Sequence, residues 1–392
     1  MNAFSKHNIA LIPDRFAHYR YPVFKLLSDD KHNNFRLVIF ADSKSKQSIN
    51  LVDPLFCNMD FENGGIRWVN IKDYYIRDIC FWQKGLLSLA FNPKLDIIVY
   101  WGEAHRISTW LSALIARYKK KKIIFWGHGI YGNESKLKLF FRKNFYRLAH
   151  KHFLYERRGK TLMVAQGFER DNLYVTFNSL DYNQHKSEMK KYSKLTKQDV
   201  YPFFRNPELP ILVFIGRLTS IKKLDMLVRA GNIINNQKTI VNLLFIGDGP
   251  YREYLENLGQ KGIFDNWLHF VGASFSEEKN GRFLFFADLC VSPGNVGLTA
   301  IHSLSFGTPV CSHNNFNNQG PEVQAIIEGY NGFLFKENDL NDLVQRIKRW
   351  FEKKTDRHQL RKQCLEIIDK YYNPEYQQSV FNRMTKNKGP EI

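Results

Sequence analysis

The fold is decided by the stretch Val213-Phe-Ile-Gly-Arg-Leu-Thr-Ser-Ile-Lys222, in which an apolar run ends at a glycine turn that carries an arginine and a lysine. Phe245-Ile-Gly-Asp-Gly-Pro250 is a second apolar run that ends at glycines. A third piece, Gly297-Leu-Thr-Ala-Ile-His-Ser-Leu-Ser-Phe-Gly-Thr-Pro-Val310, leads from a glycine through a helical pattern into another apolar run. Short apolar strands that alternate with helices through glycine turns are typical of a parallel α/β sheet.

The same alternation of short apolar runs and longer amphipathic runs continues on both sides of this stretch. In the C-terminal half it predicts a helix after Gly297, helices at 224–234, 251–258 and 339–353, and strands at 210–215, 241–246, 268–271, 289–291, 308–311 and 332–335. In the N-terminal half it predicts a helix at 106–119 and strands at 8–12, 35–40, 97–100 and 122–126. We therefore expect an α/β protein with two doubly wound, Rossmann-like domains facing a cleft.

Length and composition indicate how the chain is divided. With 392 residues it is long for one hydrophobic core, so two domains are expected. Residues 184–207 are polar with little apolar periodicity, and we interpret them as a linker. The linker would join an N-terminal domain (1–183) to a C-terminal domain (208–370), and 371–392 would be a C-terminal helix or tail.

Charge and cysteine content restrict the partners and the compartment. The formal net charge of +19 implies attraction to phosphorylated substrates, an anionic membrane surface or nucleic acid. We expect no nucleic acid, because neither metal-finger spacing nor an RNA-binding aromatic motif occurs. The five scattered cysteines form no C-x-x-C pair, as expected of a reduced, cytoplasmic protein (Cys57, Cys80, Cys290, Cys311, Cys364). Without a signal-peptide core or a bilayer-spanning apolar run, any membrane association is expected to be peripheral.

In this order and at this spacing, the three opening pieces resemble the C-terminal half of a GT-B glycosyltransferase of the family-4 type. The resemblance is strong from Leu209 to about Lys353 and weak in the N-terminal half. It implies a nucleotide-diphospho-sugar as donor and a hydroxyl as acceptor. The family's Gly-Arg-Leu-x-x-x-Lys turn holds the donor diphosphate, which here assigns Arg217 and Lys222 to that role.

The diphosphate site is expected to combine these two cations with the start of a helix. An arginine can meet two phosphate oxygens at once, whereas a lysine acts as a mobile point charge. Fixed cations and N–H groups stabilise the charge that collects on the leaving phosphate. The resemblance implies that the backbone at Gly297, Leu298 and Thr299 faces the β-phosphate at a helix start.

The sequence departs from the family at two glutamates around this helix start. Aligning Gly297-Leu-Thr-Ala puts His302 where the family's ribose-binding glutamate stands, and Gly294 where a glutamate lies near the donor sugar. A neutral imidazole can still accept one hydroxyl hydrogen bond, so His302 is a candidate ribose ligand. Glu322 resembles the Pro-Glu start of a later helix, and a helix-capping role and a donor-site role explain it equally well.

Candidates for catalysis and acceptor binding follow strands of the N-terminal half. His128, in Trp126-Gly-His-Gly129, resembles the family position at which a histidine faces the donor sugar, and we assign it to the catalytic centre with Arg217 and Lys222. Tyr19, Arg20 and Glu103 are candidate acceptor contacts. For each of these side chains, ordinary packing at a strand–helix connection is the alternative.

No metal or other cofactor is expected, because the chain has neither an Asp-x-Asp motif nor clustered His and Cys at zinc spacing.

Cations mixed with aromatics over 137–153, with a basic run at 117–122, predict a surface that docks on anionic lipid. The alternative is a core helix with a solvated cationic face.

The resemblance as a whole implies a retaining, metal-independent hexosyltransferase at the inner face of the cell membrane. It would move a sugar to a glycan or lipid-linked acceptor in surface polysaccharide or lipopolysaccharide synthesis. A sugar-nucleotide epimerase or hydrolase, which needs no acceptor, is one alternative. A catalytically silent GT-B protein that binds glycan or membrane is another; the missing glutamate pair favours it, whereas the retained Arg217 and Lys222 argue against it.

Overall fold

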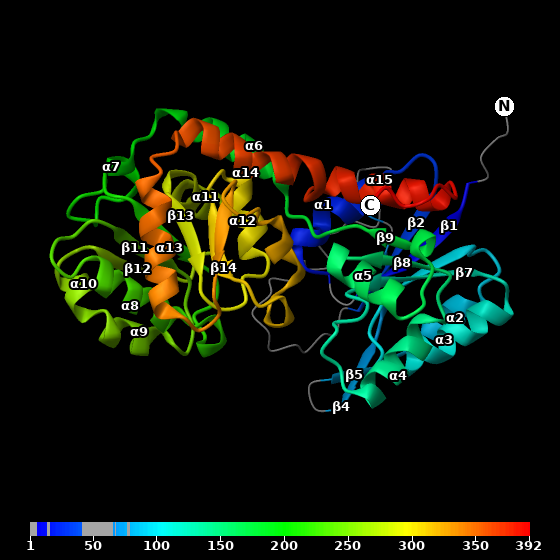
Figure 1. Ribbon diagram of the computed structural model, residues 1–392. Coiled ribbons are helices and arrows are strands. Elements are labelled where there is room, and N and C mark those ends of the chain that lie inside the picture. Colours follow the sequence, from blue (N-terminus) through cyan, green and yellow to red (C-terminus); the bar gives the residue numbers. More distant parts are fainter. Residues whose placement is uncertain (1–5, 14–15, 41–65, 67, 77–78) are drawn as a thin grey trace. The chain divides into compact units, whose positions relative to one another are not determined.

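The computed structural model describes residues 6–13, 16–40, 66, 68–76 and 79–392. The chain divides into two compact units, each with its own parallel sheet (Figure 1). Unit 1 comprises Met1–Asp181 and Asn373–Ile392, and unit 2 comprises Tyr182–Tyr372. The expected class, α/β with two doubly wound Rossmann-like domains, is confirmed. Four cysteines are free and buried, and Cys57 lies outside the described residues.

The sheet of unit 1 has seven parallel strands in the order β3-β2-β1-β6-β7-β8-β9. Their bounds are β1 Asn8–Ile12, β2 Asn34–Phe40, β3 Trp68–Ile71, β6 Ile97–Trp101, β7 Lys122–Gly127, β8 Lys151–Leu154 and β9 Leu173–Val175. The four strands predicted from the sequence are found within one residue of their expected ends. They were predictable because helices cover both faces of a parallel sheet, so its strands are almost continuously apolar.

Unit 1 also contains a hairpin of β4 Asp73–Ile76 and β5 Ile79–Gln83. Its helices are α1 Tyr21–Ser28, α2 Leu86–Phe91, α3 Ile107–Tyr118, α4 Lys136–Tyr146, α5 Arg157–Ala165 and α15 Pro374–Thr385. Alternate strand residues enter two separate apolar clusters: Trp126 belongs to one and Phe125 to the other. Because successive side chains of a strand point to opposite faces, the two clusters lie on the two sides of the sheet.

The α3 helix, predicted at 106–119, buries small side chains rather than its large apolar ones. Its apolar residues at helical spacing include Leu111 and Leu114, which are 41% and 50% exposed. The buried face consists of small residues instead, among them Ser112 and Ala113. The Ser112 hydroxyl donates to the Leu86 carbonyl and lies 2.7 Å from the Tyr100 hydroxyl, so this polar face is satisfied inside the unit.

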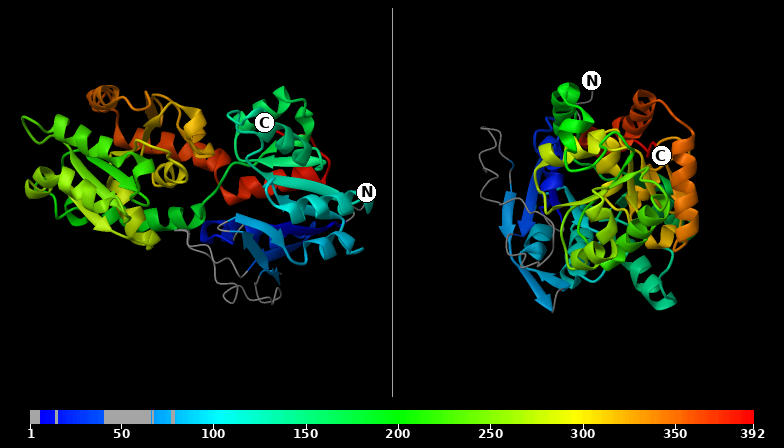
Figure 2. Two further views of the ribbon diagram at one scale, coloured as in Figure 1. Left: turned by 90° about the horizontal axis from the view of Figure 1, so that it is seen from below. Right: turned by 90° about the vertical axis from the view of Figure 1, so that its left-hand side faces the viewer.

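The last twenty residues contain a helix, one of the two forms expected for 371–392, and they belong to unit 1. The α15 helix, red in Figures 1 and 2, packs against α1. Its Phe381 is fully buried, with ring centroids 4.3 Å from Phe153 and 5.2 Å from Trp126. Gln377 donates to the Phe177 carbonyl and accepts from the Ser179 hydroxyl. The C-terminal segment is therefore part of the N-terminal core.

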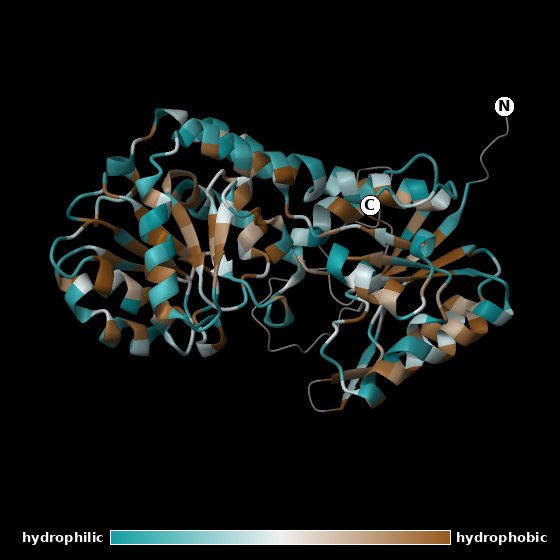
Figure 3. Ribbon diagram, viewed as in Figure 1, coloured by the Kyte–Doolittle hydropathy of each residue, from teal (hydrophilic) through white to brown (hydrophobic). Residues whose placement is uncertain are grey.

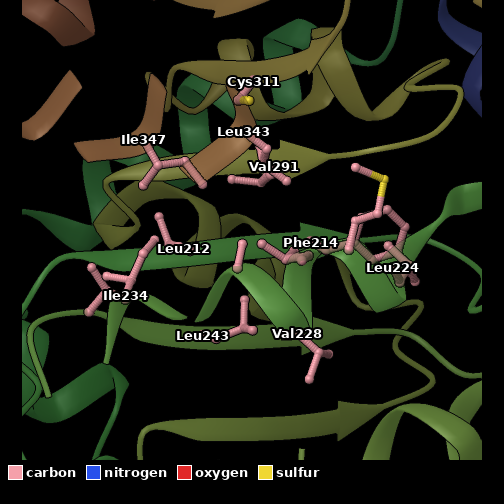
Figure 4. Close-up of a cluster of buried hydrophobic side chains, with 14 of the residues drawn as sticks. Leu212, Phe214, Leu224, Val228, Ile234, Leu243, Val291, Cys311, Leu343 and Ile347 are labelled. Atoms are coloured by element: carbon pink, nitrogen blue, oxygen red, sulfur yellow. The ribbon is translucent and has the colours of Figure 1, made fainter. Parts of the chain in front are cut away.

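The sheet of unit 2 has six parallel strands in the order β12-β11-β10-β13-β14-β15. Their bounds are β10 Ile211–Ile215, β11 Asn242–Ile246, β12 Leu268–Gly272, β13 Leu289–Ser292, β14 Val310–His313 and β15 Gly332–Phe335. The helices are α8 Leu224–Ile234, α9 Arg252–Leu258, α10 Gln260–Phe264, α11 Glu277–Phe286, α12 Thr299–Ser305, α13 Leu340–Glu352 and α14 Arg357–Tyr371. Figure 4 shows part of the core between α8, α13 and the strands, with Leu212, Phe214 and Val228 among its members.

Residues 184–207, which we interpreted as a linker, are instead an ordered part of unit 2. They contain most of α6 Tyr182–Lys191, the 3-10 helix η4 Tyr192–Lys194 and α7 Lys197–Val200. Tyr201 is fully buried and stacks on Phe283 at 5.9 Å. The pattern was misleading because α6 buries only three of its ten residues, two of them polar.

Candidate functional site

The predicted phosphate ligands lie where the strand order of unit 2 reverses. β10 and β13 are neighbours, and the chain leaves them toward opposite edges of the sheet. A crevice at the carboxyl ends of such strands is the usual ligand site of open α/β sheets. Arg217 follows β10, and Gly297 follows β13. The structure therefore brings these two predicted segments to one place.

The glycines of this region allow the backbones of two turns to lie in direct contact. A Cβ on Gly247 would be 1.9 Å from the Gly216 carbonyl oxygen, and one on Gly249 would be 2.3 Å from that of Leu218. The Leu218 amide donates to the Asp248 carbonyl at 3.0 Å. The Gly-Asp-Gly turn therefore supports the loop that carries Arg217.

The two predicted cations differ in their surroundings. Arg217 is exposed, and no hydrogen bond or ion pair from the described part of the chain engages its guanidinium. Lys222 ends the 3-10 helix η5 Ser220–Lys222, and its Nζ donates to the Asn295 carbonyl at 2.5 Å. Burial lowers the pKa of Lys222, and the nearby Glu322 carboxylate partly opposes that shift. Lys222 is thus held in place, while Arg217 is available to an incoming anion.

Glu322 is a buried carboxylate beneath this loop. It lies in the first turn of the 3-10 helix η7 Pro321–Ala325 and is 4% exposed. A Cβ on Gly320 would be 2.9 Å from its Oε2 and 3.3 Å from the Gly297 backbone. Glu322 thus lies at a helix start, and its charge acts on Lys222.

The segment after β13 offers backbone donors. α12 begins at Thr299 and has seven residues, and Gly297 just before it has φ +52°. The first N–H groups of a helix have no partner within it. Across the described residues, no backbone carbonyl accepts from the amides of Leu298 and Thr299. The Thr299 hydroxyl donates to the Ile215 carbonyl at 2.9 Å, which fixes the start of α12 to the end of β10.

His302, the candidate ribose ligand, already contacts a carboxylate. Its Nε2 lies 2.6 Å from Oε1 of Glu277, the first residue of α11. The same oxygen lies 2.9 Å from Nε2 of His185 on α6. A ribose hydroxyl would therefore have to compete with Glu277 for the His302 ring nitrogen. Sequence reasoning missed Glu277 and His185, because no local pattern connects these three distant positions.

In unit 1, His128 follows β7 and is half-buried among aromatic rings. Its ring centroid lies 5.0 Å from Tyr155 and 5.4 Å from Tyr131. Burial lowers the pKa of His128 to about 4, and the charges of Arg20 and Arg142 add to the shift. The imidazole is therefore neutral at pH 7 and can donate or accept a hydrogen bond without carrying charge.

Two further residues near His128 were not singled out from the sequence. Glu134 accepts from the Tyr131 amide at 2.9 Å and lies 3.3 Å from Nε of Arg142. Arg142 donates to the Gly129 carbonyl at 3.0 Å, and its guanidinium stacks over the Tyr131 ring. Together they fix the loop that presents His128. Their spacing of eight residues between a loop and a helix gives no sequence signal.

The predicted acceptor residues Tyr19, Arg20 and Glu103 differ in their exposure and in their contacts. Arg20 is 5% exposed and donates to the Tyr155 hydroxyl at 2.8 Å and to Asn178 Oδ1 at 3.0 Å. Its guanidinium also lies 4.8 Å from the Trp101 ring centroid. Arg20 is therefore engaged in contacts inside unit 1. Tyr19 is partly exposed beside it, and Glu103 lies 3.4 Å from His105 Nδ1.

Within the described residues, no helix is both long and apolar enough to cross a bilayer.

The C-terminal part of the chain matches a known family. The model of the glycosyl transferases group 1 family matches residues 199–366. The sulfoquinovosyl transferase SQD2 of Arabidopsis thaliana is 29% identical over 172 residues, which are 42% of this chain and 31% of that protein. The chain spans about a third to under half of the length of the curated relatives that it matches.

Solved structures share the whole fold. Anabaena Alr3699/HepE in complex with UDP has a TM-score of 0.69 at 14% identity, covering 97% of this chain and 100% of its own. The lipopolysaccharide outer core galactosyltransferase WaaB has a TM-score of 0.65 at 16% identity, covering 96% and 98%. Residues 199–366 therefore match the model of the glycosyl transferases group 1 family, and the chain has the GT-B fold.

Proposed function

We propose that this protein transfers a sugar from a nucleotide-diphospho-sugar to a hydroxyl of a glycan or lipid-linked acceptor. The observation that carries the proposal is the cation pair of unit 2. Arg217 is exposed and has no partner among the described residues, and Lys222, on the same loop, is anchored. Both lie at the strand-order reversal of a domain that matches the family. The unpaired amides of Leu298 and Thr299 add donors from the neighbouring connection.

The reaction that suits these groups is displacement on one face of the sugar, with retention. As the glycosidic bond lengthens, negative charge collects on the leaving diphosphate, and preorganised cations and N–H groups stabilise that charge. The diphosphate would accept the proton of the incoming hydroxyl. Because Arg217 and Lys222 provide the positive charge, the transfer itself is proposed to need no metal.

His128 fits the catalytic centre as a neutral group. With a pKa near 4, its ring would hydrogen-bond a donor-sugar hydroxyl rather than act as a cation. A neutral ring also avoids repelling the positive charge that develops on the sugar. This role depends on the donor site above.

A uridine nucleotide is the first donor to test. HepE has been solved in complex with UDP-glucose, with a TM-score of 0.64 at 15% identity. The acceptor is proposed to be a surface polysaccharide or lipopolysaccharide precursor, since the similar WaaB is a lipopolysaccharide galactosyltransferase. A lipid-linked acceptor also fits the exposed apolar side chains on α3 and α4 of unit 1.

The test is nucleotide binding to the full chain, measured by thermal shift with UDP, GDP and their sugars in the absence of metal. At about 100-fold excess over the dissociation constant, binding should stabilise the protein by about 2.7 kcal/mol. Arg217→Ala should weaken binding about 10- to 100-fold, because a charge-assisted hydrogen bond contributes about 1.5–3 kcal/mol. Arg229→Ala is the matched control, since Arg229 is half-exposed on α8 and lies near Asp225.

If none of these nucleotides binds, the donor site is wrong. Binding followed by sugar release or epimerisation without acceptor would favour the epimerase or hydrolase. Binding without turnover on any membrane or glycan fraction would favour the catalytically silent protein, which the absence of the glutamate pair supports.

A further inference from the structure

Three side chains of unit 2 meet in a cluster, and one of them, His302, is the candidate ribose ligand. His185 comes from α6, Glu277 from the start of α11 and His302 from the middle of α12. One ligand atom from each lies within 4.8 Å of the other two. Two imidazoles and one carboxylate form a ligand set that binds zinc in other proteins.

The contacts of His185 place its two ring nitrogens on different partners. The Ser305 hydroxyl donates to the His302 carbonyl at 2.8 Å, and its oxygen can accept a second hydrogen bond. His185 Nδ1 lies 2.8 Å from that oxygen, and a ring protonated at Nδ1 would donate to it. His185 Nε2, which would then carry a lone pair, lies 2.9 Å from the Glu277 carboxylate.

A cation shared by Nε2 and the carboxylate would receive a lone pair from each group. Packing fixes the His185 ring, which is 2% exposed. An Nδ1–H that donates to a neighbouring oxygen, with Nε2 toward the metal, is the arrangement found in metal-bound histidines.

The surroundings hold the three groups in place. The His185 ring packs 4.7 Å from Phe306 and 5.4 Å from His302 between ring centroids. The Glu277 side chain is 28% exposed, which leaves access for an ion and a water.

We propose that His185 Nε2, His302 Nε2 and the Glu277 carboxylate bind one divalent transition metal ion, with zinc as the best match and water as fourth ligand. With zinc–ligand bonds of about 2.0–2.1 Å, tetrahedral ligands are about 3.3 Å apart. The present separations of 2.6 and 2.9 Å would open by about half an ångström. The ion would fasten α6, where the chain enters unit 2, to α11 and α12.

The experiment uses the full chain after chelator treatment and dialysis. Titration with Zn²⁺ by calorimetry should show one site per chain with a dissociation constant below micromolar. Titration with Co²⁺ should give the intense visible absorption of a four-coordinate ion. His185→Gln and Glu277→Gln should each weaken zinc binding at least 100-fold. His269→Gln is the matched control, because that half-buried histidine stacks on Phe203 at 3.9 Å, outside the cluster, and should leave binding unchanged.

Two results would overturn the proposal. One is wild-type protein that shows neither a sub-micromolar zinc site nor the four-coordinate cobalt spectrum. The other is a site that persists in both cluster variants, since another of the chain's 12 histidines would then hold the ion. The wild-type measurements decide the question even if a variant fails to fold. UDP binding should survive chelation, which separates this proposal from the donor site.

Discussion

Gly294 lies where the loop after β13 crosses the backbone of η5. Its amide donates to the Lys222 carbonyl at 2.9 Å, and a Cβ there would be 2.3 Å from the Ile221 carbonyl oxygen. The family's first glutamate aligns with this position, and the structure leaves it no room. The loop instead brings the Asn295 carbonyl to the Lys222 amine. The same loop therefore leaves no room for the family's first glutamate and anchors Lys222.

Gly294→Ala should therefore destabilise unit 2 by about 2–4 kcal/mol, because the clash is with backbone that cannot move aside. It should also weaken UDP binding by displacing Lys222. Both are measured by thermal shift with and without nucleotide. The control is Gly389→Ala, since a Cβ at Gly389 meets nothing within 4 Å. Unchanged stability in Gly294→Ala would mean that the two loops are not in contact.

At the scale of elements, α3 and α4 present an apolar surface with cations beside it. On α3, Ile107, Leu111, Leu114 and Tyr118 are 54%, 41%, 50% and 82% exposed. On α4, Leu137, Phe140 and Phe141 are 68%, 62% and 55% exposed. The two helices are in contact through Trp110 and Phe145, and both show apolar patches in Figure 3. The basic run at 117–122 continues directly from α3.

Exposed aromatics beside lysines favour an anionic lipid surface. Phe140→Ser with Phe141→Ser should reduce co-sedimentation with vesicles containing anionic lipid at least fivefold, and leave vesicles of neutral lipid unaffected. Phe264→Ser is the matched control, because Phe264 is 84% exposed on α10 of unit 2. Equal loss in the control, or no loss in the double variant, would contradict membrane docking through α4.

At the scale of the whole molecule, the sequence predicted what depends on local pattern. The six strands of the unit 2 sheet and four of the seven in the unit 1 sheet were predictable, since buried strands are apolar and end at glycine turns. Arg217, Lys222 and the start of α12 were assigned through the family resemblance of the turns after these strands, and their role as donor ligands stays a prediction. Contacts between positions far apart in the sequence were not predictable from local pattern. Nothing local shows that Arg20 is enclosed by Tyr155 and Asn178, or that His302 meets Glu277.

The closure of unit 1 by α15 is another contact that no local pattern reveals. Phe381 lies more than 200 residues from every strand that it packs on, including β7 and β8. Further contacts fix the same segment: the Tyr174 hydroxyl donates to the Lys388 carbonyl, and Lys122 donates to Asn387. Unit 1 is therefore complete only when the end of the chain has returned to it.

This dependence gives a prediction that distinguishes the two units. Phe381→Ala should cost about 3–5 kcal/mol, because it leaves a cavity among Phe35, Trp126 and Phe153. Hydrogen exchange followed by mass spectrometry should show peptides from β1 and β7 exchanging about a hundredfold faster or more, while peptides from β10 and β13 keep their protection. Phe316→Ala, at a 41% exposed position in unit 2, should change neither. If β10 lost protection as much as β7, the two units would unfold as one body, and α15 could not be assigned to the N-terminal core alone.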